Sequence, residues 1–332
     1  MTQRYDADRP HEQFDRPRRH TRPRTKERPS YADADDGWVV GMDRGRYTLL
    51  VGDDERVVTA MKSRPLGRKA VVVGDRVRVV GDTSGTPDTL ARIVEVEDRK
   101  TVLRRTADDN DPIERVIVAN ADQMVVVAAL ADPPPRPRLI DRCLVAAFDA
   151  GMTPLVCLTK ADIGDPAPLV AALAPLEVDV VVTERGGDLQ MLRERLRGRT
   201  SVLVGHSGVG KSTLVNALVP EAELATGVIN EVSRRGRHTS TSTRVLALPF
   251  GGWIVDTPGI RSFGLAHVSI ERLLAAFPDL AEAARDCSRG CQHTASDPEC
   301  ALDEAVAAGT LDPARVDSFR RLLASREGAD LV

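Results

Sequence analysis

The chain has 332 residues, of which 42% are hydrophobic, 29% charged and 3% aromatic, and its formal net charge is −3. This length indicates two or three domains rather than one core, and the near-neutral charge excludes a global electrostatic attraction to nucleic acid. No apolar run approaches the roughly 18 residues that span a membrane, and the N-terminal sequence lacks the apolar stretch of a signal peptide. We therefore expect a cytoplasmic protein with no membrane partner.

Residues 1–36 form a charged segment that is poor in aliphatic residues and rich in Arg, Asp and Pro. Such a segment cannot bury enough apolar surface to fold, so its composition predicts a disordered tail. Two hypotheses stay open for this tail. It is either a solvated segment without a further role, or a basic arm that contacts RNA phosphates.

Residues 37–100 contain five short apolar or alternating runs, separated by Gly, Asp or Pro turns: WVVGM, RYTLLVG, ERVVTAM, DRVRVV and ARIVEVE. This pattern predicts a small β-barrel of the oligonucleotide-binding (OB) type, although strand propensity alone fits an SH3-like barrel equally well. Trp38 and Tyr47 are the only aromatic residues in this segment. A base-stacking platform is therefore poorly supported, and any RNA contact would use backbone and shape.

Residues 101–265 alternate between strand-like and helical patterns from about residue 113 onward. The alternation predicts a doubly wound α/β sheet with helical crossovers, in which a Pro-rich surface connection spans residues 132–138. Residues 266–332 are predicted to be a helical module, with helices near 270–284 and 302–325 on either side of a cysteine-rich loop.

A phosphate-binding loop is predicted between a strand and a helix, where the sequence fits the pattern Gly, four residues, Gly-Lys-Ser. Its glycines let backbone N–H groups turn inward and form an anion-binding nest at a helix N-terminus. Lys211 would reach the β- and γ-phosphates, and the Ser212 hydroxyl would bind Mg²⁺. The predicted loop residues are Gly205, His206, Ser207, Gly208, Val209, Gly210, Lys211, Ser212 and Thr213.

Asp256 ends a buried apolar strand and begins the sequence Asp-Thr-Pro-Gly. An acid in this position, downstream of a phosphate loop, is expected to hold Mg²⁺ directly or through water. Gly259 of the same sequence could donate its N–H to the γ-phosphate.

A base-reading box is predicted upstream, at Thr159, Lys160, Ala161 and Asp162. The carboxylate of Asp162 can accept from both N1–H and the exocyclic amine of guanine, a donor pair that adenine lacks. The stem of Lys160 would cover the face of the base. In ordinary guanine-nucleotide switches the phosphate loop comes first and the base box late. The reversed order here indicates a circular permutation.

The segment between the phosphate-loop helix and Asp256 is polar and rich in hydroxyls, which suits a loop that donates a hydroxyl to Mg²⁺ when GTP is bound. The pattern does not decide among residues 239–241, and we take Thr241 as the candidate. Many GTPases carry a water-orienting glutamine where this chain has Ile260. The sequence therefore predicts slow intrinsic hydrolysis, with His238 as a candidate for the missing group.

Four potential metal ligands lie within 14 residues near the C-terminus: Cys287, Cys291, His293 and Cys300. Three thiolates and one imidazole fill a tetrahedral Zn²⁺ shell and leave no position for water. The cluster therefore predicts one structural zinc per chain. Cys143 and Cys157 stand alone in apolar segments and are expected to be buried side chains.

These motifs, in this order, resemble the ribosome-small-subunit-dependent GTPase A family over residues 37–325. The resemblance rests on the predicted barrel, TKAD, GHSGVGKST, GRHTSTST, DTPGIRSFGL and the Cys/His cluster. It implies a circularly permuted GTPase that acts late in small-subunit assembly. It also implies GTP hydrolysis stimulated by the small ribosomal subunit, rRNA contacts from the barrel and the zinc module, Mg²⁺ with GTP, and structural zinc.

The chain departs from the family pattern at three places. Thr159 replaces the commoner asparagine, and residues 182–184 match the usual Ser-Ala base-supporting loop poorly. Cys287 and Cys291 are separated by three residues, and His293 and Cys300 by six, where the family usually has four and five.

Three hypotheses follow for the function. The first is a monomeric GTPase that binds the small subunit and its rRNA and turns GTP into GDP. The second is an rRNA-binding assembly protein whose nucleotide domain is vestigial, against which the intact Lys211, Ser212 and Asp256 argue. The third is an ATP-dependent kinase, which Asp162 disfavours.

Overall fold

The computed structural model describes residues 31–67, 71–105, 115–220, 243–257, 265 and 268–326. The described structure begins with a closed β-barrel, which confirms the barrel predicted from the sequence. The barrel strands are β1 (Asp35–Asp43), β2 (Arg46–Val51), β3 (Arg56–Lys62), β4 (Arg76–Val80) and β5 (Ala91–Val96).

The strand order of the barrel decides between the two barrel types that the sequence left open. The order is β1-β2-β3-β5-β4, with β3 parallel to β5 and with β4 closing the barrel on β1. This Greek-key order is that of the OB fold. Inward-facing Val, Leu and Ile side chains such as Val39, Leu49 and Ile93 are fully buried and fill the interior. The alternation of apolar and polar residues along each strand therefore builds the barrel core.

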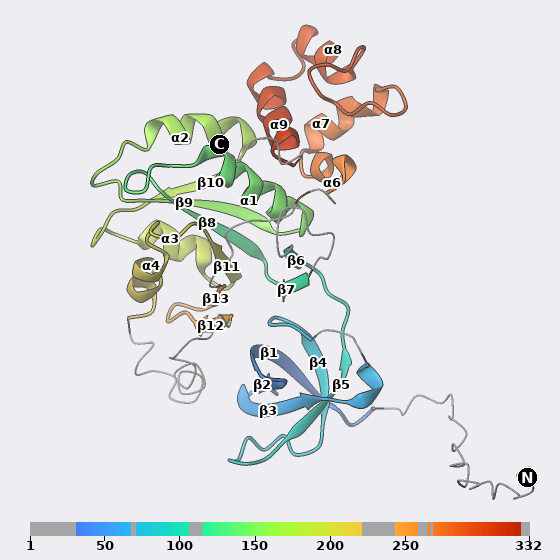
Figure 1. The fold of residues 1–332 in the computed structure, drawn as a ribbon, viewed down its shortest axis with the longest axis vertical. Coiled ribbons are helices and arrows are strands. Elements are labelled where there is room, and N and C mark those ends of the chain that lie inside the picture. The colour runs from blue at the N-terminus through green and yellow to red at the C-terminus, as the bar shows by residue number, and fades with distance from the viewer. Residues whose placement is uncertain are drawn as a thin grey trace, which may run out of the picture. The chain divides into compact units, whose positions relative to one another are not determined.

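A mixed six-stranded sheet forms the centre of the α/β region (Figure 1). Its order is β10-β9-β8-β11-β13-β12, and all neighbouring pairs are parallel except β12 with β13. The strands are β8 (Gln123–Ala129), β9 (Thr153–Thr159), β10 (Asp179–Val182), β11 (Thr200–Val204), β12 (Arg244–Ala247) and β13 (Trp253–Asp256). The predicted parallel core is confirmed, and β12 adds an antiparallel edge.

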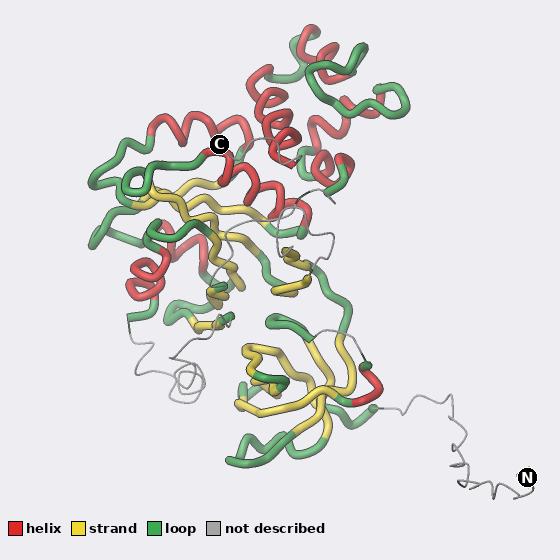
Figure 2. The backbone as a smooth tube through the Cα atoms, in the orientation of Figure 1, coloured by secondary structure: helices red, strands yellow, loops and turns green. Residues whose placement is uncertain are grey.

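Two pairs of helices cover the two faces of this sheet (Figure 2). Alternate residues of β8 divide between the faces, so Met124 packs with α1 and Val125 with α3 and α4. The helices are α1 (Pro137–Asp149) and α2 (Ala167–Leu173) on one face, and α3 (Gln190–Leu196) and α4 (Lys211–Leu218) on the other. The helical crossovers predicted from the alternation are therefore confirmed.

A small antiparallel ribbon between the barrel and the sheet was not predicted. It consists of β6 (Val102–Arg105) and β7 (Arg115–Ala119). The sequence interpretation placed the start of the α/β alternation near residue 113, within this ribbon. The apolar run of β7 gave no sign that its partner is β6, because a period of two shows a strand but not its neighbour.

The C-terminal part contains the expected helices around the cysteine-rich loop. They are α6 (Ile270–Ala275), α7 (Pro278–Ala283), α8 (Ala301–Ala307) and α9 (Pro313–Arg326). Phe277 and Phe319 are buried and pack edge to face with ring centroids 5.5 Å apart. Among the described residues, every helix is too short or too polar to cross a bilayer.

Arginine side chains of α9 fasten this helix to the α/β region. Arg315 makes two hydrogen bonds to the carboxylate of Asp279 and one to the carbonyl of Pro175, and its guanidinium lies over the ring of Phe277. Arg321 bonds to the buried carboxylate of Asp141 in α1. Burial raises the pKa of Asp141, and the nearby Arg321 opposes this shift.

Arg315 provides a test of this attachment. Arg315→Met keeps an apolar stem but removes the bonds to Asp279 and Pro175. We expect the free energy of unfolding to fall by about 2 kcal/mol, less than the ~3–5 kcal/mol for a fully buried pair, because Asp279 is 41% exposed. Urea unfolding followed by circular dichroism measures this loss.

The pH dependence of the loss has a defined sign. Hydrogen bonds from Arg315 hold the pKa of Asp279 below its ordinary value. The stabilisation is therefore present at neutral pH and should shrink as the pH falls below about 4, where the unfolded carboxyl takes up a proton. Arg285→Met is the control, since its pair with Glu282 is exposed and contributes about 0.5 kcal/mol or less. An equal loss in both variants would contradict the special role of Arg315.

Candidate nucleotide site and metal cluster

The carboxyl ends of the parallel strands bring the predicted nucleotide-binding segments to one edge of the sheet. β11 lies between β8 and β13, and β9 lies on the other side of β8. The base box follows β9, the phosphate loop follows β11, and Asp256 ends β13. In open α/β sheets, ligands bind outside the carboxyl ends of the strands. The fold therefore gathers three motifs that lie far apart in the sequence.

The phosphate loop joins β11 to α4 through residues 205–210, as predicted. Gly205 has φ of +150°, and a Cβ added there would lie 2.3 Å from the carbonyl oxygen of Val127. Only glycine fits this close approach to β8. Ser207 and Gly208 are exposed at the tip of the loop, whereas Val209 is buried beneath it.

Lys211 begins α4 and folds back over the loop. Its Nζ donates hydrogen bonds to the carbonyl oxygens of Gly205 at 2.5 Å and His206 at 2.8 Å. Burial lowers the pKa of Lys211, and the negative charge of Asp256 acts in the opposite direction. The ammonium group is thus held inside the loop, where a bound phosphate would supply a compensating charge.

Asp256 and Ser212 lie on the two elements next to the loop. Asp256 pairs in register with Leu203, near the end of β11, and Thr257 anchors the next turn by donating its hydroxyl to the Leu203 carbonyl at 3.2 Å. Ser212 lies exposed in the first turn of α4, followed by Thr213. An acid and a hydroxyl from these elements suit the two protein ligands expected of Mg²⁺ in a phosphate-loop GTPase.

The base box leaves β9 through a residue with a positive φ. Lys160 has φ of +63°, and its Nζ donates to the carbonyl oxygen of Asp132 in the Pro-rich connection. The Ala161 N–H donates to the Thr183 carbonyl at 3.2 Å. Asp162 follows with an exposed side chain. The box is therefore held by the side chain of Lys160 and by the main chain of Ala161, while the carboxylate proposed to read guanine stays accessible.

Thr159, the first residue of the box, makes its side-chain contacts with another segment. Its side chain is buried, and its hydroxyl donates to the carbonyl of Val209 in the phosphate loop at 2.7 Å. The carbonyl of Ala128 lies farther away, at 3.3 Å. The sequence placed Thr159 in the base pocket, whereas the structure joins its hydroxyl to the phosphate loop.

Thr183 is a supporting residue that the sequence interpretation passed over. It is buried after β10, its N–H donates to the Leu158 carbonyl at 2.7 Å, and its own carbonyl accepts from Ala161. Residues 182–184 were judged a poor match to a base-supporting loop. The contact of Thr183 with Ala161 uses backbone atoms, which a motif defined by side chains cannot find, whereas its hydroxyl donates to the Leu158 carbonyl at 3.3 Å.

Four residues of the expected site lie outside the described residues. They are Gly259, His238, Thr241 and Ile260. Their roles remain predictions from the sequence.

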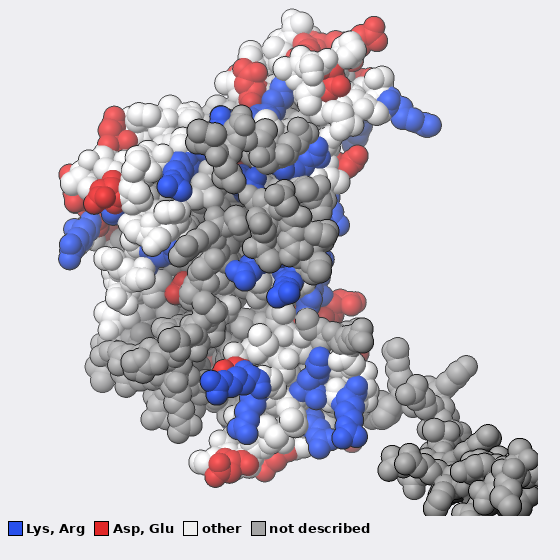
Figure 3. Space-filling view, in the orientation of Figure 1, with Lys and Arg blue, Asp and Glu red and all other residues white. Residues whose placement is uncertain are grey.

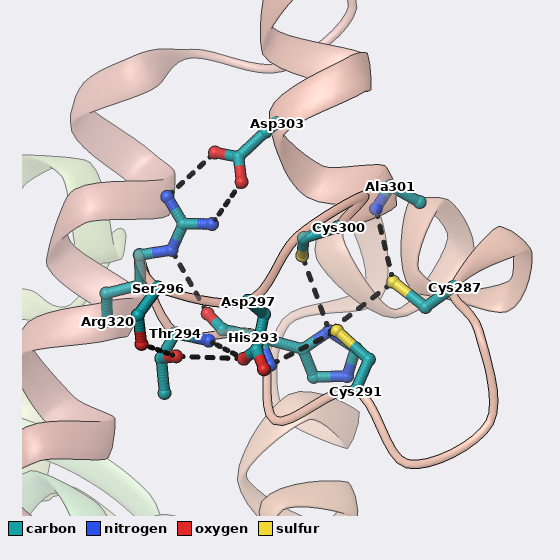
Figure 4. Close-up of polar contacts among 10 residues, drawn as sticks. All are labelled: Cys287, Cys291, His293, Thr294, Ser296, Asp297, Cys300, Ala301, Asp303 and Arg320. Carbon is teal, nitrogen blue, oxygen red and sulfur yellow. Dashed lines mark hydrogen bonds and ion pairs between the residues drawn. The ribbon is translucent and has the colours of Figure 1, made fainter.

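The metal cluster is brought together as expected from its spacing (Figure 4). The Sγ atoms of Cys287, Cys291 and Cys300 lie 3.5, 3.4 and 3.8 Å from Nδ1 of His293. A tetrahedral zinc with bonds of about 2.3 Å to sulfur and about 2.0 Å to nitrogen requires a separation of about 3.5 Å between these atoms. The donor set therefore fits a four-coordinate structural metal, with every ligand supplied by the protein.

Hydrogen bonds around the cluster orient its ligands. The Ala301 N–H donates to Sγ of Cys287 at 3.3 Å, which places the start of α8 against the cluster. Arg320 of α9 donates to the His293 carbonyl and makes a bidentate pair with Asp303 (Figure 4). Burial lowers the pKa of His293 and raises that of the Cys291 thiol to about 11. Metal binding would therefore release protons from the thiols.

Comparison with known proteins places these features in a family. The sequence profile described as RsgA GTPase matches residues 96–266. The protein named small ribosomal subunit biogenesis GTPase RsgA from Chlorobaculum parvum is 36% identical over 303 residues, which cover 87% of this chain and 97% of the relative. The protein of the same name from Ectopseudomonas mendocina is 42% identical over 218 residues, or 63% of each chain.

Two solved structures are also similar. The crystal structure of YjeQ from Thermotoga maritima has a TM-score of 0.63 and 26% identity, and the match covers 89% of this chain and 99% of that one. The crystal structure of YloQ, described as a circularly permuted GTPase, has a TM-score of 0.64 and 25% identity, with 92% and 99% covered. This chain belongs to the RsgA GTPase family.

The RsgA GTPase match includes the base box, the phosphate loop and Asp256, and it ends before the metal cluster. The permuted order inferred from the motifs agrees with the description of YloQ. The alignment with the Chlorobaculum relative extends the likeness beyond the matched GTPase region.

Removing one thiolate tests the metal cluster. We expect purified protein to carry about one metal ion per chain and Cys291→Ser to lose it, because three remaining ligands hold the ion less well. The helices around the cluster should loosen locally, while GTP binding stays largely intact. Elemental analysis measures the metal, and hydrogen exchange locates the loosening.

Cys143→Ala is the matched control, because Cys143 is buried in α1 and is not part of the cluster. It should keep the full metal content. Metal-free wild-type protein, prepared without chelator, would contradict the assignment of the cluster.

Proposed function

We propose that this chain is a GTPase of small-subunit biogenesis that binds the small ribosomal subunit through its rRNA and hydrolyses GTP to GDP and phosphate. One observation carries the GTPase assignment. The base box and the phosphate loop meet at one edge of the sheet although their order in the chain is permuted. The names of the relatives from Chlorobaculum and Ectopseudomonas support the assignment to the small subunit.

The nucleotide would lie across the carboxyl edge of the sheet, with its base at Asp162 and its phosphates at the loop. Lys211 and the loop N–H groups would neutralise the charge that develops on the transferred phosphoryl group. Ser212 and Asp256 would hold Mg²⁺, with Thr241 as a further candidate. Because Ile260 cannot hydrogen-bond to water, hydrolysis by the free protein should be slow.

The RNA-binding surface of the proposal lies on the barrel, where Lys and Arg side chains gather over the strands (Figure 3). Arg46 of β2 and Arg92 of β5 both pair in register with Met61 of β3, so the three form one row across the barrel. All three are exposed, and within the described part of the chain neither arginine forms an ion pair. Two unpaired cations on a strand face suit contacts to a phosphate backbone.

The metal of the C-terminal cluster would be one structural Zn²⁺ per chain, since Cys₃His is a donor set typical of closed zinc sites. Through Arg320 and the neighbouring Arg321, α9 links this cluster to α1 of the sheet. Zinc would thus stabilise the C-terminal helices, which α9 attaches to the α/β region.

Base recognition provides the first test. Asp162→Asn should weaken GTP binding by about 100-fold, because two hydrogen bonds to a charged acceptor are lost. The same variant should bind xanthosine triphosphate more tightly, since an amide can donate to the extra carbonyl of xanthine. Competition of both nucleotides against a fluorescent GDP measures the exchange of specificity.

Asp165→Asn is the matched control for the base. Asp165 is an exposed carboxylate in the same loop, where it accepts from the Ala167 N–H at 2.9 Å just before α2. Its replacement should leave both affinities unchanged. Unaltered GTP affinity in Asp162→Asn would refute the assignment of the base reader.

Stimulation by the small subunit is the test of the function itself. Purified small subunits should raise the rate of GTP hydrolysis by roughly 100-fold or more, as when a missing catalytic group is supplied by a partner. Arg46→Glu with Arg92→Glu should lose most of the stimulation and flatten its salt dependence, while the rate of the free protein stays unchanged. Phosphate release with and without subunits measures both.

Arg197→Glu is the control, because it reverses an exposed charge at the end of α3 on the sheet. Full stimulation of the variant that carries both Arg46→Glu and Arg92→Glu would place the RNA contact outside this row of the barrel. A rate indifferent to the small subunit would overturn the proposed function.

A further inference from the structure

The outside of the barrel carries an apolar row besides the row of exposed arginines. Trp38 of β1 pairs in register with Leu50 of β2, which in turn pairs with Val57 of β3. Trp38 and Leu50 are each 5% exposed, and both belong to the apolar cluster of the α/β region, which includes Val255 of β13. The row is therefore covered by the α/β region and lies outside the barrel core.

An aromatic pair shows which part of the sheet the row contacts. The ring centroids of Trp38 and Trp253 lie 4.9 Å apart with an angle of 71° between the planes, the edge-to-face arrangement that aromatic rings favour. Strand β1 also contacts β12, which is the last strand of the six-stranded sheet. The barrel thus lies at the antiparallel edge that β12 and β13 form.

The strand that carries Trp253 also carries the Mg²⁺-binding candidate. β13 has four residues, with Trp253 at its start and Asp256 at its end. At a rise of about 3.3 Å per residue, the two are about 10 Å apart along the strand. Asp256 pairs with Leu203 on one side and with Arg244 on the other. Packing that fixes the start of so short a strand therefore also fixes the position of Asp256.

Backbone atoms join the barrel to the α/β region at a second place. The Ala119 N–H donates to the Val73 carbonyl, and the Asn120 side chain donates to the Gly74 carbonyl, both at 3.0 Å. A Cβ added to Gly74 would lie 1.8 Å from the Ala119 carbonyl oxygen, so the two segments are in close contact. Hydrogen bonds are directional, whereas apolar packing is not. A force on the barrel is therefore expected to displace the tryptophan pair before it displaces this joint.

We infer that Trp38 and Trp253 are positioning residues for Asp256, through which the barrel acts on the nucleotide site. RNA bound at the exposed arginines of the barrel would set the position of β1, and the tryptophan pair would pass this to β13. Asp256 would then hold Mg²⁺ where stimulated hydrolysis requires it. The inference rests on the proposed function and names the route by which that function is regulated.

Trp38→Leu tests this route, because it keeps an apolar side chain and removes the edge-to-face contact. With saturating small subunits, kcat should fall about tenfold, since a displacement of 1 Å in a reacting group can cost up to about 100-fold. The affinities for the subunit and for GDP should stay within about threefold of the wild type. Trp38→Phe keeps an aromatic edge and should restore kcat. Trp253→Leu should equal Trp38→Leu, and the double variant should lose no more than either, because both act through one contact.

Val39→Ala is the matched control for lost stability. Val39 follows Trp38 in β1, but its side chain is fully buried in the barrel interior. Its truncation should destabilise the barrel and leave the stimulated kcat unchanged.

Tryptophan fluorescence provides a measurement that does not involve hydrolysis. The chain has two tryptophans, so its emission comes from this pair alone. Coupling between two sites is reciprocal, so occupation of the Mg²⁺ site should act back on the pair. Adding Mg²⁺ to the GDP complex should therefore shift the emission of the wild type and leave that of Asp256→Asn unchanged.

The outcomes separate the inference from the proposed function. An unchanged kcat in Trp38→Leu, an equal loss in Val39→Ala, or an emission that does not respond to Mg²⁺ would each overturn the inference and leave the GTPase assignment standing. A fall in subunit affinity that accounts for the whole loss would place Trp38 in docking and would overturn it as well. A wild-type rate that is indifferent to the small subunit would overturn the proposed function and this inference together.

Discussion

The parallel pairing of β11 between β8 and β13 is the constraint on which the rest of the structure depends. It aligns Leu203 with Asp256 and Val204 with Val126, so the segments that follow all three strands leave from one edge. β9 joins the other side of β8 and brings the base box to the same edge. Hydrogen-bonded register of this kind does not depend on the order in which the strands are synthesised. A permuted chain can therefore keep the nucleotide site as long as these pairings are kept.

A second constraint acts through α9, whose arginines reach in two directions. Arg320 bonds to the backbone of the metal ligand His293, whereas Arg315 and Arg321 bond to groups of the α/β region. The Pro175 carbonyl that Arg315 holds precedes β10, and β10 is followed by Thr183, whose carbonyl accepts from the Ala161 N–H of the base box. Helix α9 thus contacts both the metal cluster and the segment that leads into β10.

Most of the fold could be predicted from the sequence because its signals are local. Alternating residues mark the barrel strands, glycines and Lys211 mark the phosphate loop, and three cysteines with His293 mark the metal cluster. The parts that were missed depend on contacts distant in the chain. The pairing of β6 with β7 and the antiparallel β12 follow from which strands become neighbours. The hydroxyl of Thr159 in the predicted base box also bonds to the Val209 carbonyl, a contact that no local pattern encodes.

The permutation has a consequence for β13, which becomes the last strand of the sheet in the chain. At one end, Trp253 packs edge to face on Trp38 of the barrel, with ring centroids 4.9 Å apart, and Arg76 lies over Trp38. At the other end, Asp256 lies beside the phosphate loop, and the chain continues from there toward α6. In an unpermuted order, the base-box strands would follow this strand. Here the strand that carries the Mg²⁺-binding candidate contacts the barrel at its start and leads to the metal-binding module after its end. A displacement of the barrel would therefore reach β13 through the contact between Trp38 and Trp253.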